Sequence, residues 1–212
     1  MNDARCRLFL VTPPSADIET FAACFEQAAK AGDVASVLIT PAADRGETVD
    51  LISAVMPAGY EHNVAVLVAD DPELTAESGA DGTQISGTLE DYRHARDMLG
   101  SDRIIGALAN GSRHGIMELG DAGIDYVAFD QTRPIRIGSG DTQEDVDPIA
   151  WWSELFEIPC VAFAPAGFDD IDTLVRAGSD FIRPEDAMWS SLERAAETVK
   201  RYNARIDDLS EQ

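Results

Sequence analysis

The sequence has few basic residues, and lysine is almost missing from it. Lysine and arginine number 16 against 39 aspartates and glutamates, so the formal charge is −23, and Lys30 and Lys200 are the only lysines. A surface this acidic repels nucleic acid and anionic lipid, which excludes both as expected partners. We attribute the charge mainly to solubility. A phosphorylated ligand would need a local base or a metal ion in order to approach.

Long apolar segments and cysteine motifs are also missing. No window approaches the roughly 20 apolar residues that a membrane helix requires, and the first apolar run, residues 8–11, is too short for a secretory signal. Cys6, Cys24 and Cys160 form no CxxC motif, so neither a disulfide framework nor a zinc site is expected. We therefore predict a soluble, cytoplasmic protein with no membrane partner.

Short apolar runs alternate with segments of helical periodicity along the whole chain. None of the runs alternates cleanly with polar residues, so each is predicted to be a parallel strand that is buried on both faces. No glycine-rich dinucleotide motif follows the first run, which argues against an open doubly wound sheet. The eight predicted strands are residues 8–11, 34–39, 64–69, 83–85, 104–108, 126–129, 161–164 and 181–182.

A glycine followed within two residues by an aspartate recurs just before several of these strands. It stands in residues 31–33, 78–81, 122–125 and 177–180. Glycine suits the left-handed residue that ends a helix. A repeated helix-to-strand junction together with eight strands predicts an α/β protein with the (β/α)8 TIM barrel fold, as a single domain over residues 1–212.

Several segments resemble the thiamine phosphate synthases and the related thiazole tautomerases. The resemblance runs in register through RLFLVT (7–12), GADGTQI (79–85), LGSDRIIG (99–106), AGIDYV (122–127) and AGSD (177–180). It implies a barrel of thiamine biosynthesis, a transferase that joins hydroxymethylpyrimidine pyrophosphate to thiazole phosphate with magnesium. Such chemistry requires cations that stabilise the departing pyrophosphate.

Most of the residues that this resemblance implies are replaced. Ile39 and Pro41 stand where the family has two bases, and Arg45 is the nearest arginine in the sequence. Gln84 stands in place of a histidine in the fourth strand. The glycine pair that cradles the product phosphate corresponds to residues 164–166, where proline removes an N–H donor.

The rest of the family's site departs in the same way. Its phosphate loop after the eighth strand corresponds to residues 183–187, which contain two carboxylates. The tautomerase histidine aligns with Gln131, and a second magnesium aspartate falls on Leu89. Asp91 is close to that position, but with Thr88 it predicts a capping box. We leave the catalytic residues unassigned and interpret the site as degraded or altered.

The candidates for ligand binding stand at or beyond the carboxyl ends of predicted strands, where barrel enzymes have their sites. His114 is the only plausible general base among the histidines. Arg183 and the N–H groups near Gly167 could hold one phosphate, or Arg183 could instead pair with Glu185 and Asp186. The full set of candidates is Thr12, Asn110, His114, Gln131, Arg133, Gly167 and Arg183.

Asp70 and Asp71 are the candidate metal ligands, because carboxylate oxygens suit Mg²⁺. Asp70 occupies the position of a magnesium aspartate in the family that the chain resembles. The alternative is that the two aspartates cap a helix that begins at Pro72.

Two further segments carry predictions. Residues 130–148 form the longest irregular stretch, which is either a solvated loop or an active-site lid. Trp151 and Trp152 are not expected to face the core from one helix together. One of them is therefore predicted either to be exposed at a partner surface or to lie beneath the 130–148 loop, and we favour the exposed position, as a contact in a homodimer.

Three functions remain open. The first is an enzyme of thiamine biosynthesis with an altered site, and the second is a binding or regulatory barrel that lost the chemistry. The third is an enzyme that uses the acidic rim on a non-phosphorylated substrate. In each case the expected partner is a small molecule. For the first function it is a phosphorylated pyrimidine or thiazole, and for the third a substrate unrelated to thiamine. The acidic rim favours a neutral or cationic ligand, such as an unphosphorylated thiamine-related heterocycle, over a phosphorylated one.

Overall fold

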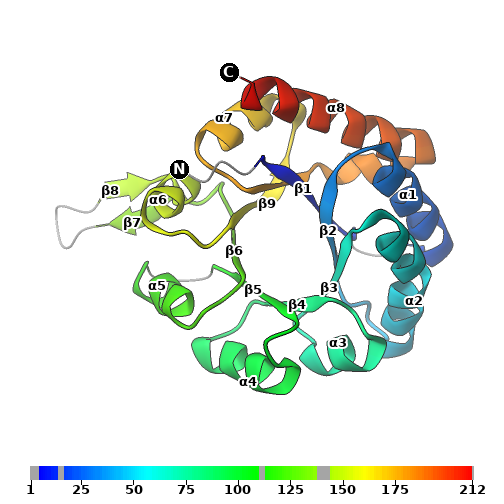
Figure 1. Ribbon diagram of the computed structural model, residues 1–212, viewed down its shortest axis with the longest axis horizontal. Helices are drawn as coiled ribbons and strands as arrows, with labels where there is room; N and C mark the ends of the chain where they lie inside the picture. The colour runs from blue at the N-terminus through cyan, green and yellow to red at the C-terminus, as the bar shows by residue number, and fades with distance from the viewer. Residues whose placement is uncertain (1–4, 14–16, 110–112, 138–143, 212) are drawn as a thin grey trace.

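The computed structural model describes residues 5–13, 17–109, 113–137 and 144–211. Eight parallel strands close into a barrel in the order β1-β10-β9-β6-β5-β4-β3-β2, and helices surround it (Figure 1). The barrel strands are β1 (Arg7–Val11), β2 (Val34–Ile39), β3 (Ala65–Ala69), β4 (Gly82–Ile85), β5 (Ile104–Leu108), β6 (Tyr126–Phe129), β9 (Cys160–Ala166) and β10 (Phe181–Pro184). The predicted (β/α)8 barrel is confirmed, and each predicted strand is present.

The helices follow the strands as the barrel fold requires. They are α1 (Ile18–Ala31), α2 (Arg45–His62), α3 (Pro72–Ser78), α4 (Leu89–Leu99), α5 (Arg113–Asp121), α6 (Pro148–Leu155), α7 (Ile171–Arg176) and α8 (Leu192–Ser210), with 3₁₀ turns η2 (Phe168–Asp170) and η3 (Asp186–Ser190). Among the described helices, none is long and apolar enough to cross a membrane. The predicted capping box begins α4, where the N–H and hydroxyl groups of Thr88 each donate to Asp91 Oδ2 at 2.7 Å.

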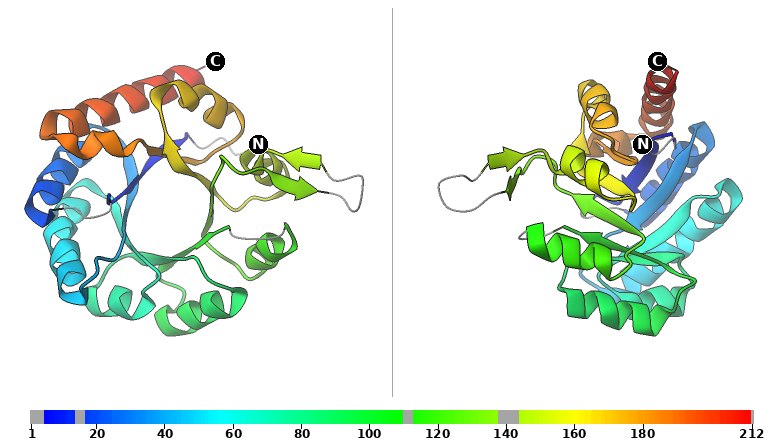
Figure 2. Two further views of the ribbon diagram at one scale, coloured as in Figure 1. Left: turned by 180° about the vertical axis from the view of Figure 1, so that it is seen from behind. Right: turned by 60° about the vertical axis from the view of Figure 1, so that its left-hand side comes forward.

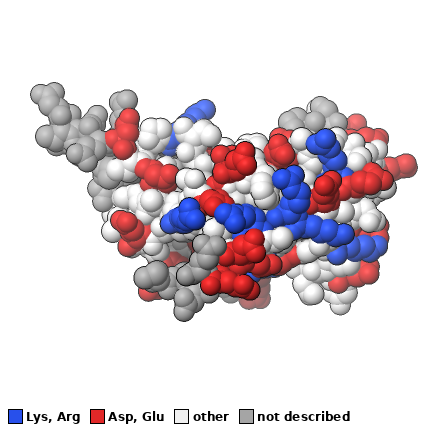
Figure 3. All heavy atoms as spheres, turned by 90° about the horizontal axis from the view of Figure 1, so that it is seen from above, with Lys and Arg blue, Asp and Glu red and all other residues white. Residues whose placement is uncertain are grey.

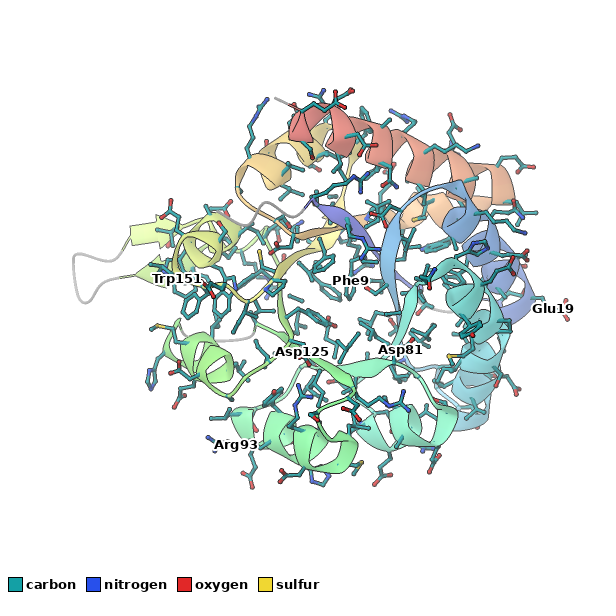
Figure 4. The ribbon with its side chains drawn as sticks, in the orientation of Figure 1. Phe9, Glu19, Asp81, Arg93, Asp125 and Trp151 are labelled. Atoms are coloured by element: carbon teal, nitrogen blue, oxygen red, sulfur yellow. The ribbon has the colours of Figure 1, made fainter. Side chains whose placement is uncertain are left out.

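The recurring glycine–aspartate junction has a structural role, because its aspartate binds the start of a neighbouring strand. In three junctions the glycine has a positive φ. The aspartate that follows makes two hydrogen bonds to one residue near the start of the neighbouring strand. Its carboxylate accepts the backbone N–H of that residue, and its own backbone N–H donates to the carbonyl of the same residue. Figure 4 shows two of these aspartates, Asp81 and Asp125, beside the barrel wall. The pairs are Asp81 with Val66, Asp125 with Ile105 and Asp180 with Cys160, at 2.7 to 3.1 Å.

Side chains fill the inside of the barrel. Phe9 lies there (Figure 4), with its ring edge-on to Tyr126 and Phe163 at centroid distances of 5.6 and 6.1 Å. The buried residues of this inner cluster are Phe9, Val11, Leu38, Leu67, Tyr126, Ala128 and Val161. A second, larger cluster lies between the strands and the surrounding helices.

Residues 130–148 contain a β-hairpin, which the sequence did not predict. Strands β7 (Ile135–Ile137) and β8 (Glu144–Val146) pair antiparallel, and the hairpin projects from the barrel (Figure 2). Ile135 and Val146 pack against the main core. Whether the hairpin acts as a lid stays a prediction.

The prediction of an exposed tryptophan in α6 was wrong. Trp151 and Trp152 are 7% and 0% exposed. Phe156, which follows α6, stacks on Trp152 at 3.9 Å and meets Trp151 edge-on at 6.0 Å. Phe156, just beyond the helix, therefore extends the core around both tryptophan rings. Since neither tryptophan is exposed, the exposed-tryptophan argument for a homodimer no longer holds.

Position 106 in β5 must be glycine, because the ring of Tyr126 lies close to the β5 backbone inside the barrel. A Cβ atom at this position would lie 2.0 Å from Cζ of Tyr126. We expect Gly106→Ala to destabilise the protein by about 1–3 kcal/mol, because the ring cannot move without disturbing the inner cluster. Urea unfolding measures this. Gly120→Ala in α5 is the control, since its closest contact would be 3.2 Å, and equal losses in the two variants would contradict the packing argument.

Candidate ligand-binding site

Most of the predicted site residues lie at the carboxyl-terminal end of the barrel. Thr12 follows β1, Asp70 and Asp71 follow β3, Gln131 and Arg133 follow β6, Gly167 follows β9 and Arg183 is in β10. Asn110 lies outside the described residues. His114, in α5, has a side chain that is 84% exposed, and its Nε2 is 3.7 Å from Oε1 of Glu118 in the same helix.

Thr12 is buried, and its side chain joins two strand ends. Its hydroxyl oxygen accepts the N–H of Thr40 at 2.8 Å, and Thr12 is 2% exposed. The hydroxyl therefore orders the ends of β1 and β2. A direct contact between Thr12 and a ligand stays a prediction.

Asp70 has an exposed carboxylate on a left-handed backbone. Its φ is 55°, a conformation that aspartate tolerates better than most residues. Ser86, just after β4, donates its N–H to Oδ1 at 2.6 Å and its hydroxyl to Oδ2 at 2.5 Å. The neighbouring strand end thus fixes the orientation of the Asp70 carboxylate.

Asp71 caps α3, in agreement with the prediction that it would cap a helix beginning at Pro72. Its Oδ1 accepts the N–H of Leu74 at 2.7 Å, and its Oδ2 accepts Nη1 of Arg45 at 2.7 Å. Arg45 also donates to Oε2 of Glu77 at 2.9 Å, and the two carboxylates raise the pKa of Arg45. Arg45, the arginine closest in sequence to the end of β2, is therefore paired with two carboxylates.

These carboxylates do not form an assembled magnesium site. Within the described ranges, no group of three or more histidine, cysteine, aspartate or glutamate side chains is placed to hold a metal ion. The cation beside Asp71 is the Arg45 guanidinium. Asp70 is the only one of the two predicted ligands whose carboxylate is free of an ion pair with a described residue.

Gln131 binds a strand of its own barrel. Its Nε2 donates to the carbonyl of Ala164 at 2.8 Å, and its Oε1 accepts the N–H of Ala164 at 2.8 Å. The side chain thereby continues the pairing of β6 and β9 beyond the end of β6. Both halves of the amide are used, so Gln131 has a structural role.

The two groups predicted to hold a phosphate already bind carboxylates of the chain. The N–H of Gly167 donates to Oδ2 of Asp170 at 2.8 Å. Arg183, whose side chain is 13% exposed, donates from Nη2 to Oδ1 of Asp186 at 2.8 Å, and its guanidinium lies 5.4 Å from the centre of the Phe163 ring. Arg183 therefore pairs with Asp186, which is one of the two acids that the alternative prediction named.

Arg133 is paired as well, but in solvent. Its Nε lies 3.0 Å from Oδ2 of Asp130, and its side chain is 84% exposed. Exposed pairs of this kind contribute little to stability, so Arg133 remains the most available of the predicted cations.

Sequence reasoning missed one polar contact inside the barrel. The hydroxyl of Tyr126 donates to Oε1 of Gln84 at 3.0 Å, and the two residues are 5% and 4% exposed. Burial, with a smaller effect from the charge of Asp125, raises the pKa of Tyr126 well above its usual value. The contact joins β4 and β6 across β5. The only sequence signal was Gly106, the residue of β5 that leaves room for it.

The fold and this rim define a TIM barrel whose polar site lies at the carboxyl ends of its strands, the common arrangement of barrel enzymes that act on small molecules. The family model described as "Thiamine monophosphate synthase" matches residues 8–192, and the chain belongs to this family.

Known proteins similar to the chain agree with this assignment. The thiamine-phosphate synthase of Rhodospirillum centenum is 35% identical over 93% of this chain and 96% of the relative. That of Hyphomonas neptunium is 34% identical over 97% of this chain and 96% of the relative. The solved structure of thiamine phosphate pyrophosphorylase from Pyrococcus furiosus superposes with a TM-score of 0.77, at 18% identity and 98% coverage of both chains, which supports the fold.

Removal of the Gln131 side chain tests its structural role. We expect Gln131→Ala to lower the free energy of unfolding by about 1–2 kcal/mol, because both backbone groups of Ala164 lose their partner. Urea unfolding would detect this loss. Gln27→Ala in α1 is the matched control, and a Gln131→Ala variant as stable as that control would rule out the role.

Proposed function

We propose that the protein is a thiamine phosphate synthase-like barrel of thiamine biosynthesis that binds a thiamine-related heterocycle without its phosphate. We further propose that it acts in the cytoplasm and does not form thiamine phosphate at a rate typical of a synthase. One observation carries the proposal: two donors of the predicted anion site, the N–H of Gly167 and Nη2 of Arg183, already hold the carboxylates of Asp170 and Asp186.

A phosphate that used the Gly167 N–H and Nη2 of Arg183 would have to displace both carboxylates. Asp170 lies only three residues from Gly167 and Asp186 three residues from Arg183, so the displaced charges would stay close to the incoming anion. Like charges at short range repel each other most strongly where the environment is partly buried. A neutral or cationic heterocycle does not meet this repulsion.

The groups that would stabilise a departing pyrophosphate are also missing. Ile39, at one position of the family's bases, is completely buried, and Arg45 is held by Asp71 and Glu77. Loss of a single preorganised donor commonly lowers a rate by about 10²–10³. Loss of several such groups together supports the proposal that the synthase reaction is close to silent.

Magnesium binding remains part of the proposal only through Asp70. Its exposed carboxylate at the rim is the one candidate ligand that is free of a cationic partner among the described residues. An increase in melting temperature with Mg²⁺ that is lost in Asp70→Asn would support this role, because a ligand of the folded state stabilises it.

The synthase reaction gives the first test. We expect purified protein to convert hydroxymethylpyrimidine pyrophosphate and thiazole phosphate, with Mg²⁺, at least about 10³-fold more slowly than a family member that has both bases and the glycine pair. Product formation is followed by chromatography. Robust turnover would show that other arginines serve as the cations, and Arg45, Arg133 and Arg136 would be replaced first.

Ligand preference gives the second test. By calorimetry in low salt without metal, we expect thiamine to bind more tightly than thiazole phosphate, because the rim repels anions. Asp170→Asn should strengthen the binding of thiazole phosphate. Asp169→Asn is the matched control: it removes the same charge one residue away but leaves the Gly167 contact in place. Tighter binding of thiazole phosphate than of thiamine by the wild-type protein would refute the proposal.

A further inference from the structure

The contact between Tyr126 and Gln84 is unusual for its place in the fold. Phe9 and Leu67 are among the apolar residues of the same inner cluster. A polar group in such surroundings is costly unless it is hydrogen-bonded. The Tyr126 hydroxyl and Gln84 Oε1 satisfy each other at 3.0 Å, so half of the Gln84 amide is accounted for.

Gly106 shows that the chain is built to permit this contact. It pairs with Gln84 on one side and with Tyr126 on the other, and the tyrosine ring lies directly over its Cα. Any side chain at position 106 would block the path between the two residues. The edge-on contact with Phe9 holds the ring from the other side.

The other half of the Gln84 amide has no partner. Its Nε2 donates no hydrogen bond to a residue in the described part of the chain, although an amide nitrogen carries two donors. Ala69, the register partner of Gln84 in β3, and Leu108, two residues beyond Gly106 in β5, are half-buried members of the inner cluster, so the cluster becomes accessible on this side. Gln84 therefore has unused donors just below the carboxyl-terminal end of the barrel.

We propose that Tyr126 is a positioning residue, which holds the Gln84 amide so that its nitrogen donates to a ring-nitrogen or carbonyl acceptor of a bound heteroaromatic ligand. The inference rests on the proposed function, because that ligand is the unphosphorylated heterocycle. A neutral donor requires no charge on its partner. A site that is built to hydrogen-bond its ligand also rejects analogues that lack the acceptor.

Tyr126 is suited to this task over the working range of pH. Burial keeps the pKa of its hydroxyl far above neutrality, so it remains a donor. The donor engages Oε1 of Gln84 and leaves Nε2 for the ligand. Without the hydroxyl, the amide could rotate and present either its oxygen or its nitrogen.

The test compares Tyr126→Phe, Gln84→Met and the double variant. Dissociation constants for hydroxymethylpyrimidine are measured by calorimetry, and urea unfolding verifies that each variant is folded. We expect Tyr126→Phe to weaken binding about tenfold, which corresponds to about 1.4 kcal/mol, and the double variant to bind as Gln84→Met does. Tyr92→Phe is the control, because it removes a buried hydroxyl that donates to the carbonyl of Gly123, away from the inner cluster.

Non-additivity of the two changes distinguishes positioning from a general loss of stability. Unchanged binding by Tyr126→Phe, or losses that add in the double variant, would overturn the inference while leaving the proposed function intact. If the wild-type protein binds neither hydroxymethylpyrimidine nor thiamine, the proposed function fails and the inference fails with it. A benzene analogue without ring nitrogens should bind wild type and Tyr126→Phe equally, and a tenfold difference there would also count against the inference.

Discussion

Three aspartates at the amino-terminal end of the barrel, Asp81, Asp125 and Asp180, each bind the start of a neighbouring strand through carboxylate and backbone together. A parallel strand has no hairpin turn to fix its register, so contacts at the strand start must do this. The paired strands are β3 with β4, β5 with β6 and β9 with β10. Register that is set at one end decides which side chains meet at the other. The contact of Asp70 with Ser86, between the ends of β3 and β4, depends on it.

The excess of acidic residues is used in the same way at the other end of the molecule. Asp71, Asp91 and Asp170 accept backbone N–H groups where helices or turns begin, as aspartate does well. On the face seen from the side of α7 and α8, basic and acidic side chains are interleaved, so charges are also balanced locally (Figure 3). At Gly167 such a contact affects ligand binding, because the backbone N–H that could bind an anion already donates to the Asp170 carboxylate.

Local patterns made much of this structure predictable. Apolar runs located each strand of the barrel, the Thr88–Asp91 spacing located the start of α4, and the position of Asp71 before Pro72 correctly offered a helix cap. Contacts between distant segments were not predictable in this way. The burial of both tryptophans depends on Phe156, which lies outside their helix. Strands β7 and β8 have only three residues each, too few for a periodicity signal. The meeting of Tyr126 and Gln84 depends on barrel closure and on a glycine in the strand between them.

Family membership and the state of the site answer different questions. The sequence match covers almost the whole barrel because the residues that fix strand register and fill the core are spread over the whole chain. Substrate choice depends on a few side chains at one end, and these can change without loss of the fold. Here Arg45 and Arg183 each donate to a carboxylate. Among the described residues, neither the buried Nε of Arg183 nor Nε2 of the neutral Gln84 amide has an acceptor. The carboxylates that hold Arg45 and Arg183, together with the neutral donor of Gln84, support the proposed preference for an uncharged ring. That preference is argued from the residues present rather than from the family's reaction.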